Sequence, residues 1–507
     1  MHSDYPEPTL TRLAPQQLVL LLLAPLLLWP AIVNGGAFFF SDTSSYIRTI
    51  DALAVRVIDR PSDWTTERTM RVMPATARHA TPVRSSVIAA AEAPVLAGRS
   101  PYYGALAYLG VLGGSFWIVL AIQALAAMTV VLGAMRHAVS PERHRAFALA
   151  VAGAAALMAI TPLPFYVSML MPDLFAGLAI VAAAVLLTGW RRETRAGRLG
   201  WLALAAYGAL THSATMLILL ALVSAAALLW VLRRRAAPAG VALVAIAAAA
   251  LTGMVGEMLC GAVVERMIGH PPIRPPFITA RLTADGVGTD YLKRHCGTEH
   301  WLLCRYRARL PAHSDSFLWS DNPANGVFMT IPPAQARALS AEQVPFVLAV
   351  LRDRPVAVIR SSGAAILDQA TQVGLTDFHY TAQEYAGFVE RVPPALAAQL
   401  RDTGAFRRTL PLAPIVALAW PLFAISLALI GWAWTRPAMR RQALLGAWAL
   451  FGWGMNIAIC GAMSTPHDRY NMRVLWMLPL AAAVIAAAAI RRERGAPRLD
   501  AAVPASI

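Results

Sequence analysis

The stretch that decides the fold is residues 191–235, which read RRETRAGRLGWLALAAYGALTHSATMLILLALVSAAALLWVLRRR. Basic clusters stand at both ends, and the polar turn Thr211-His212-Ser213 separates two apolar halves, 199–211 and 214–232. Arginines are retained on the cytoplasmic side of a membrane, so this pattern predicts two crossings with the turn on the opposite side. A full crossing takes about 20 apolar residues. Because both halves are short, we expect the polar turn to lie within the membrane thickness, packed in protein or beside a wet cavity.

The composition of the whole chain agrees with a membrane protein. Of its 507 residues, 57% are hydrophobic and 14% are charged, and the mean hydropathy is +0.53. Soluble proteins carry about 45–50% apolar and about 25% charged residues. These values exclude an ordinary soluble enzyme, a disordered chain, a collagen and a coiled coil. The net charge of +16 would by itself allow nucleic-acid binding. The arginines punctuate apolar runs instead of forming one basic face, so no nucleic-acid partner is expected.

Further apolar runs on both sides of this stretch predict an all-α polytopic membrane protein with about ten transmembrane helices. The predicted spans are residues 16–34, 105–134, 146–163, 172–190, 199–211, 214–232, 239–262, 411–434, 443–463 and 474–490. The first run is preceded only by Arg12 and has no small-residue cleavage site. We therefore expect it to be retained as a helix, not removed as a signal peptide.

Short loops between the predicted spans alternate in charge and so predict the orientation. Arginine clusters mark the loops and tail of one side, at 136–145, 191–198, 233–235, 436–441 and 491–498. The opposite short loops carry only Arg469 and Arg473. The positive-inside rule places both termini in the cytoplasm.

Two long outer segments divide the chain into three parts. An N-terminal membrane module, 1–262, includes an outer loop at 35–104. An extracytoplasmic or interfacial segment, 263–410, precedes a C-terminal membrane module with its cytoplasmic tail, 411–507. Apolar residues at helical spacing from Tyr46 onward predict an amphipathic helix that lies along the membrane surface.

The second outer segment is expected to form a small irregular cap followed by interfacial or re-entrant helices at 341–352 and 355–373. Cys296 and Cys304 flank a tryptophan in this segment, where an oxidising compartment permits a disulfide. Spacing alone leaves that pairing open. Cys260 and Cys460 lie in apolar runs and are expected to be inert buried side chains.

Polar residues gather at helix ends on the predicted outer side. Four patches share this position: Ser41-Asp42-Thr43-Ser44-Ser45-Tyr46, Met171-Pro172-Asp173, Thr211-His212-Ser213 and the run 464–473. The first three have structural explanations, because Asp42 suits a helix cap, Asp173 suits the first turn of a helix and His212 suits a tight turn. The run 464–473 holds more polar groups than a turn needs. Ionisable groups at this depth usually mark a substrate path or site.

These residue types point to phosphate and acid–base chemistry. Arg469 and Arg473 are four residues apart, so they share one helix face, and guanidinium groups suit bidentate contact with phosphate. Asp42 would take a proton from an attacking hydroxyl, or join Asp173 in holding Mg or Mn through oxygen ligands. The candidate residues are Asp42 and Asp173 as catalytic acids, with Tyr46, His212, His467, Asp468, Arg469, Tyr470 and Arg473 as substrate-binding residues. No zinc spacing, phosphate-binding glycine loop or nucleophile elbow competes with them.

This layout resembles the GT-C superfamily of integral-membrane glycosyltransferases. In that family a catalytic acid follows the first helix, as Asp42 does, and surface-lying helices follow the acid, as the stretch from Tyr46 would. A further acid before the fourth helix resembles Asp173. The resemblance implies a sugar donor carried on a polyprenyl phosphate or diphosphate, and a lipid, glycan or protein acceptor at the outer face of a bacterial inner membrane. Asp42 would be the base or positioning acid, and Arg469 or Arg473 would bind the donor phosphate.

Two other functions fit the same sequence. A multipass transporter or flippase for a lipid-linked or anionic solute would also place ionisable groups near membrane-spanning helices. A polymerase or ligase of surface polysaccharide would share the arginine chemistry. We find no internal repeat, and the polar patches crowd one face, which favours an enzyme working at the outer interface. A transferase site further predicts that Asp42, Asp173, His212 and Arg473 line one outward-facing cavity.

Overall fold

The computed structural model describes residues 19, 22–58, 63–64, 96–232 and 239–495. Over these residues every regular element is a helix, and extended backbone pairs only at two isolated bridges, Phe38 with Met169 and Leu96 with Ile273. The predicted all-α class is confirmed for this part of the chain. The arginine triplet 233–235, both tails, and residues 59–62 and 65–95 of the predicted outer loop lie outside the described residues.

The helices follow one another in this order. They are η1 (Ala24–Leu28), α2 (Trp29–Asn34), α3 (Thr43–Ile58), α6 (Pro101–Leu112), α7 (Trp117–Met135), α8 (His144–Ala159), α9 (Leu163–Val167), α10 (Asp173–Gly189), α11 (Arg195–Thr211), α12 (Ser213–Leu232), α13 (Gly240–Ile268), α14 (Phe277–Ala284), α15 (Val287–His295), η3 (Leu302–Arg309), α16 (Ser314–Trp319), α17 (Pro333–Asp353), α18 (Pro355–Thr371), η4 (Thr376–Phe378), α19 (Ala382–Arg391), α20 (Pro394–Arg401), α21 (Gly404–Arg407), α22 (Leu412–Trp434), η5 (Pro437–Met439), α23 (Arg440–Met463), α24 (Asp468–Leu475) and α25 (Met477–Gly495).

Among the described residues, 6 helical stretches are long and apolar enough to cross a membrane, as expected of a membrane protein. They are Trp117–Met135, Ser213–Leu232, Gly240–Met267, Leu412–Trp434, Pro437–Met463 and Asp468–Arg492. Shorter apolar helices run over Ala24–Asn34, His144–Ala159 and Asp173–Gly189. Each of these lies on or overlaps a span expected from the sequence.

The prediction of one helix over residues 105–134 is wrong. Helix α6 ends at Leu112 and α7 begins at Trp117. The apolar run continues through the break, but Gly114 has φ +67, which a helix does not allow and which glycine adopts without steric cost. A continuous hydropathy signal therefore covers two helices.

The described part of the stretch 191–235, up to Leu232, forms the expected pair of helices, but only α11, with 17 residues, is short, because α12 has 20 residues and is long enough to cross a membrane. Helix α11 ends at Thr211, His212 is extended, and α12 begins at Ser213. The imidazole Nδ1 of His212 accepts a hydrogen bond from the Ala214 amide at 3.2 Å, so the histidine caps the start of α12. The turn is only partly buried, since Thr211 is 2% exposed but His212 is half-buried and Ser213 is exposed.

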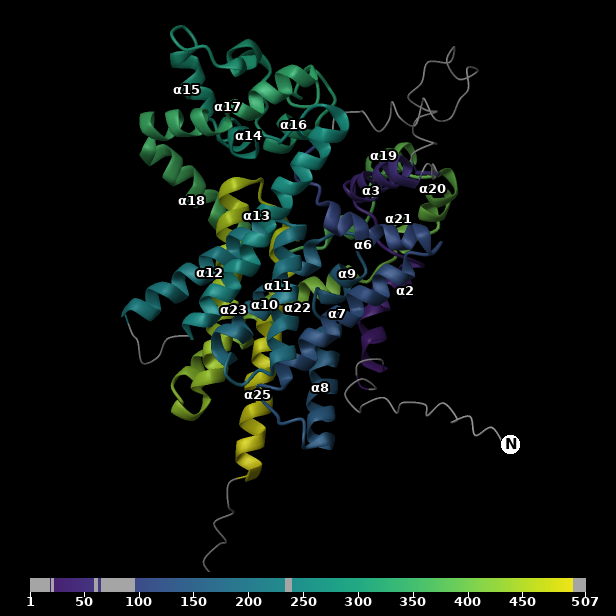
Figure 1. Ribbon diagram of the computed structural model, residues 1–507, viewed down its shortest axis with the longest axis vertical. Coiled ribbons are helices and arrows are strands. Elements are labelled where there is room, and N and C mark those ends of the chain that lie inside the picture. Colours follow the sequence, from purple (N-terminus) through teal and green to yellow (C-terminus); the bar gives the residue numbers. More distant parts are fainter. Residues whose placement is uncertain (1–18, 20–21, 59–62, 65–95, 233–238, 496–507) are drawn as a thin grey trace, which may run out of the picture.

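Figure 1 shows the apolar helices as one tall bundle, with two groups of short helices at the same end. Helix α10 lies inside this bundle and is buried along nearly its whole length. One group of short helices, α14 to α17, stands above the end of α13, and α18 leads from it back to the bundle. The other group contains α3 and α19 to α21.

The described residues of the predicted segment 263–410 contribute to two hydrophobic cores. Residues from Ile273 to Val350 form a core of their own, which we call the cap. Residues from Leu375 to Leu410 instead join the core of the membrane bundle. Hydrogen bonds fix them there, because the Tyr380 hydroxyl accepts from the Phe39 amide at 2.8 Å.

Candidate functional site

A cavity of about 980 Å³ lies where the bundle, the cap and α3 meet. One part of its wall is apolar and comes from α13, through Leu259 and Val263, and from the cap, through Phe328 and Ile331. The polar and charged side chains that line it are Ser41, Asp42, Ser45, Arg48, Thr49, Arg99, Asp315, Arg391, His467 and Arg469, with the hydroxyls of Tyr102 and Tyr470 nearby. The lining of the cavity therefore combines charged groups with apolar side chains.

Asp42 lines the cavity and lies immediately before α3. Its carboxylate accepts a hydrogen bond from Arg99 Nη2 at 2.6 Å, and the two side chains are 22% and 15% exposed. The next residue, Thr43, holds the turn before α3, because its hydroxyl accepts from the Phe40 amide at 2.9 Å and donates to the Leu170 carbonyl. The carboxylate of Asp42 is thus held by an arginine at the cavity wall.

Arg469 reaches the same cavity from α24. Its guanidinium lies 4.0 Å above the centre of the Phe40 ring, and its Nε is 3.8 Å from a carboxylate oxygen of both Asp173 and Asp377. Its Nη1 is buried and has no hydrogen-bond partner. An unpaired buried donor on a cation is costly. Arg469 therefore has a free donor that an anionic ligand in the cavity could bind.

The carboxylate of Asp377, when ionised, offsets part of the positive charge of Arg469. Burial raises the pKa of the Asp377 carboxyl to about 6, against the opposing effect of the nearby Arg469 charge. The carboxylate is 24% exposed and lies in η4, a segment that the sequence pattern did not single out. Its charge therefore changes close to neutral pH.

Behind the cavity, Arg473 lies at the centre of a buried polar network. Its side chain is 0% exposed, and Nη1 donates to Asp173 Oδ1 at 3.2 Å. Nη2 donates to Asn456 Oδ1 at 2.9 Å and to Cys460 Sγ at 3.3 Å. The Nε2 of His212 lies 3.4 Å from Nη1. Cys460 is buried as expected, but it serves as an acceptor for this arginine and is not surrounded by apolar groups alone.

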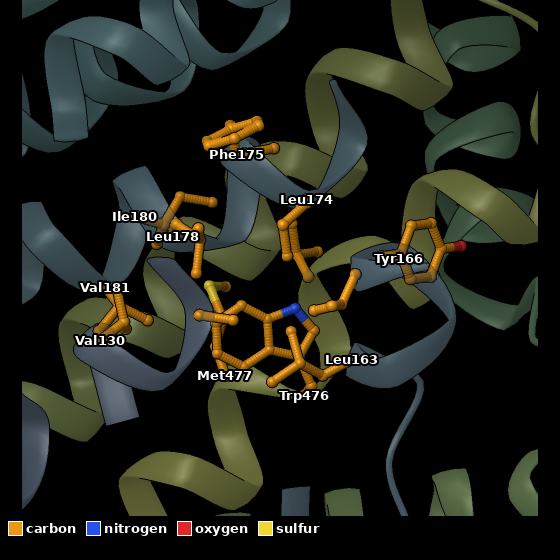
Figure 2. Packing of buried hydrophobic residues seen from close by; sticks show 14 of the residues in the cluster. Val130, Leu163, Tyr166, Leu174, Phe175, Leu178, Ile180, Val181, Trp476 and Met477 are labelled. Atoms are coloured by element: carbon orange, nitrogen blue, oxygen red, sulfur yellow. The ribbon is translucent and has the colours of Figure 1, made fainter. Parts of the chain in front are cut away.

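A tryptophan fixes the geometry of this network. Figure 2 shows the indole of Trp476 enclosed by side chains that include Leu163, Leu174 and Leu178. Its Nε1 donates to the Arg473 carbonyl at 2.9 Å. A Cβ on Gly177 would come within 2.7 Å of the indole, so only glycine lets α10 approach this closely. This packing holds the start of α10, and with it Asp173, beside Arg473.

The cap closes the cavity through a second set of polar contacts. The imidazole Nε2 of His467 lies 2.9 Å from Asp315 Oδ2, and Thr465 donates to Asp315 Oδ1 at 3.1 Å. Burial raises the pKa of Asp315, but the hydrogen bond and charge of His467 outweigh it, so the net pKa is lowered. Arg99 also stacks over the Trp319 ring of the cap at 5.1 Å. The cap is therefore joined to the bundle at the mouth of the cavity.

The candidate residues therefore occupy different places. Those that line the cavity are Asp42, His467, Arg469 and Tyr470. Asp173, His212 and Arg473 form the network behind it, so the expectation that they line one cavity with Asp42 is wrong. Arg469 and Arg473 lie in one helix, α24, as their spacing predicted. Only Arg469 reaches the cavity, because Arg473 is buried between α10 and α23.

Two candidates hold the local structure together. Asp468 accepts from the Thr376 hydroxyl at 2.8 Å and from the Arg469 amide at 2.7 Å, so it ties the start of α24 to η4. Tyr46 is 3% exposed and packs edge-on against Tyr103, and burial raises the pKa of its hydroxyl. Neither residue lines the cavity.

The two candidate acids do not suit a shared cation. Asp42 is paired with Arg99, and Asp173 is paired with Arg473, so a cationic side chain already stands beside each carboxylate. The described residues hold no cluster of three or more histidines, cysteines, aspartates or glutamates that would ligate a metal. The arrangement fits an anionic ligand better than Mg or Mn.

Cys296 and Cys304 form a disulfide in the cap, with Cα atoms 5.6 Å apart, as the sequence allowed. Cys260 is only half-buried and lines the cavity, so it is not the inert core residue expected. Comparison of the chain with protein-family models, with curated proteins and with solved structures gives no match.

Proposed function

We propose that the protein transfers a sugar from a polyprenyl-phosphate-linked donor to an acceptor at the outer face of a bacterial inner membrane, in the manner of GT-C glycosyltransferases. The observation that carries the proposal is the cavity itself. It brings one carboxylate, Asp42, and one arginine with an unpaired buried donor, Arg469, into one lining with apolar side chains of α13 and the cap. A lipid-linked phosphate has this combination of an anion and a long apolar chain.

The proposed topology has about ten crossings with both termini in the cytoplasm. The 6 long apolar stretches, the three shorter apolar helices and α11 supply the crossings. The arginine clusters of the short loops set the orientation by the positive-inside rule. The cavity then opens on the extracytoplasmic side, where the cap disulfide is chemically favoured.

The chemistry follows from the positions of the two groups. The acceptor hydroxyl attacks the anomeric carbon of the sugar, and Asp42 takes the hydroxyl proton, a role that requires hydrogen-bond reach. The bond from the anomeric carbon to the phosphate oxygen breaks, and that oxygen leaves with the electron pair. Arg469 stabilises the negative charge of the departing lipid phosphate. Arg99 orients the Asp42 carboxylate, and Arg473 positions α24 through Asp173.

The experiment compares glycans in a strain that lacks the endogenous protein and carries either the wild type or a variant. Asp42→Asn and Arg469→Ala should each reduce the glycan product by about 100-fold or more, the usual contribution of a catalytic base or an electrostatic stabiliser. Asp402→Asn is the matched carboxylate control, because Asp402 is 77% exposed and pairs with Arg407 at the surface. Mass spectrometry of the glycan gives the readout, at protein levels checked by immunoblot.

The same strains separate the transferase from a flippase. A transferase without its base leaves the lipid-linked sugar on the outer leaflet, where periodate added to spheroplasts oxidises it. A flippase variant leaves that lipid protected on the inner leaflet. Glycan profiles that stay the same in both variants at normal protein levels would contradict the proposal.

A further inference from the structure

The ionisable groups that line the cavity are unbalanced. Among the described residues, four arginines line it, at 48, 99, 391 and 469, against two aspartates, Asp42 and Asp315. The aspartates already have partners, Arg99 for Asp42 and His467 for Asp315. Four guanidinium groups against two carboxylates give the lining a net charge of two positive, and three of the arginines have no carboxylate partner in the lining. A cavity with low-dielectric walls concentrates anions of matching charge.

The surplus lies at Arg48, Arg391 and Arg469. Arg469 has an Nη1 that is buried and unpaired, and its ion-pair distances to Asp173 and Asp377 are both long, at 3.8 Å. Neither Arg48 nor Arg391 forms an ion pair with a carboxylate of the described residues. These three guanidinium groups are therefore available to a ligand.

Helix α3 sets the distance between Arg48 and Arg469. Ser45, Arg48, Thr49 and Ala52 line the cavity at spacings of three and four residues, which places them on one face of the helix. Arg469 lies over Phe40, just before that helix begins. Arg48 is about 8 Å further along the axis than the first residue of α3, at 1.5 Å per residue. The flexible arms of the two arginines can converge on neighbouring phosphates from opposite ends.

We infer that the lipid-linked donor carries a diphosphate and not a monophosphate, with Arg469 on one phosphate and Arg48 and Arg391 on the other. This inference rests on the proposed function. A diphosphate joined to a lipid and a sugar carries two negative charges, which matches the net charge of the lining. The corresponding monophosphate carries one and would leave the lining with one net positive charge. The Ser45 hydroxyl, one turn before Arg48 on the same face of α3, supplies a neutral donor, whereas the Thr49 hydroxyl already donates to the Ser45 carbonyl at 2.8 Å.

The competing explanation is a monophosphate donor with a separate anionic acceptor at Arg48 and Arg391. The geometry favours a single ligand, because the three arginines border one continuous cavity and α3 presents Arg48 and the two hydroxyls on the same face. Binding of the lipids alone, without an acceptor, separates a diphosphate donor from a monophosphate donor with a separate acceptor.

The test uses the full-length protein in lipid nanodiscs and measures, by native mass spectrometry, binding of the methyl esters of undecaprenyl monophosphate and undecaprenyl diphosphate, which carry one and two negative charges as the sugar-linked donors do. The wild type should bind the diphosphate about tenfold more tightly or better, the value of one charge-assisted hydrogen bond. Arg48→Gln combined with Arg391→Gln should reduce that preference to less than about threefold while monophosphate binding stays unchanged. Arg469→Gln should weaken both lipids. Arg305→Gln, at an exposed residue of the cap outside the cavity, is the matched control.

Equal binding of the two lipids by the wild type would overturn the diphosphate inference and leave the transferase proposal standing. The diphosphate inference is also overturned, with the transferase proposal intact, if the double variant keeps the full preference. If the folded wild type binds neither lipid, the proposed function fails as well. A melting midpoint for each variant within about 2 °C of the wild type shows that lost binding is not lost folding.

Discussion

Replacing Asp173 with asparagine removes the carboxylate that Arg469 and Arg473 share. Asp173 is 3% exposed and Arg473 is 0% exposed, so neither charge has access to water. The other groups within hydrogen-bond distance of Arg473, which are Asn456, Cys460 and His212, include no carboxylate. Removing one partner of a buried ion pair typically costs about 3–5 kcal/mol, because the other charge remains buried without compensation. We expect Asp173→Asn to fall in that range.

Removing the arginine of this pair should lower the stability less than removing the carboxylate does. In Arg473→Met the carboxylate of Asp173 keeps Arg469, whose Nε is already 3.8 Å away, and methionine fills most of the space that arginine leaves. The double variant Asp173→Asn with Arg473→Met buries no unpaired charge at this position. It should therefore be more stable than Asp173→Asn alone, with a favourable coupling of at least about 1 kcal/mol.

The assay is the melting midpoint of each detergent-solubilised variant at one fixed scan rate, because unfolding of a membrane protein in detergent is often irreversible. Asp402→Asn, at the surface, serves as the control and should leave the midpoint unchanged. The reasoning would be refuted by a double variant less stable than either single variant. It would also be refuted by an Asp173→Asn protein as stable as the wild type.

Three further predictions concern the pH dependence of stability, the disulfide of the cap and the packing at two glycines. Burial raises the pKa of Asp377 to about 6, above the value of about 3.9 for an unfolded chain, so the stability it contributes is complete below pH 4 and is lost as the pH rises through 6. Asp377→Asn should abolish that part of the decline in melting midpoint between pH 4 and pH 7. Replacing Cys296 and Cys304 with serine should cost the cap about 2.5 kcal/mol from the short loop it closes, seen as faster proteolysis of the cap alone. Gly104→Ala should destabilise by about 1–3 kcal/mol, because its Cβ would meet a backbone oxygen of α3 at 2.5 Å, whereas Gly153→Ala, with nothing within 4 Å, should not lower the melting midpoint.

Much of the bundle could be predicted because the length of an apolar run and the charge of its flanks are local properties. The break between α6 and α7 could not, since Gly113 and Gly114 sit inside an unbroken apolar run. Hydropathy carries no information about φ. Where a glycine turn interrupts such a run, hydropathy therefore predicts one helix although the chain forms two.

The site was predictable only in part for a related reason. The spacing of Arg469 and Arg473 correctly placed them on one helix face, but their depth depends on which neighbours cover that face. The contributions of Arg99, Asp315 and Asp377 were missed because each comes from a loop or short helix whose approach is decided by tertiary packing. A single polar residue in such a segment gives no periodic signal.

The contrast between the cap and the buried network has a consequence for the order of assembly. The cap core is drawn from one contiguous segment, Ile273 to Val350, so it closes through short-range contacts. It can form, with its disulfide, while α22 to α25 are still being synthesised. Asp173 and Arg473 are 300 residues apart and meet only once the final helices arrive. Pairing of these two charges is therefore a late event in biogenesis, and a chain that ends before α24 must bury Asp173 without the arginine that compensates it.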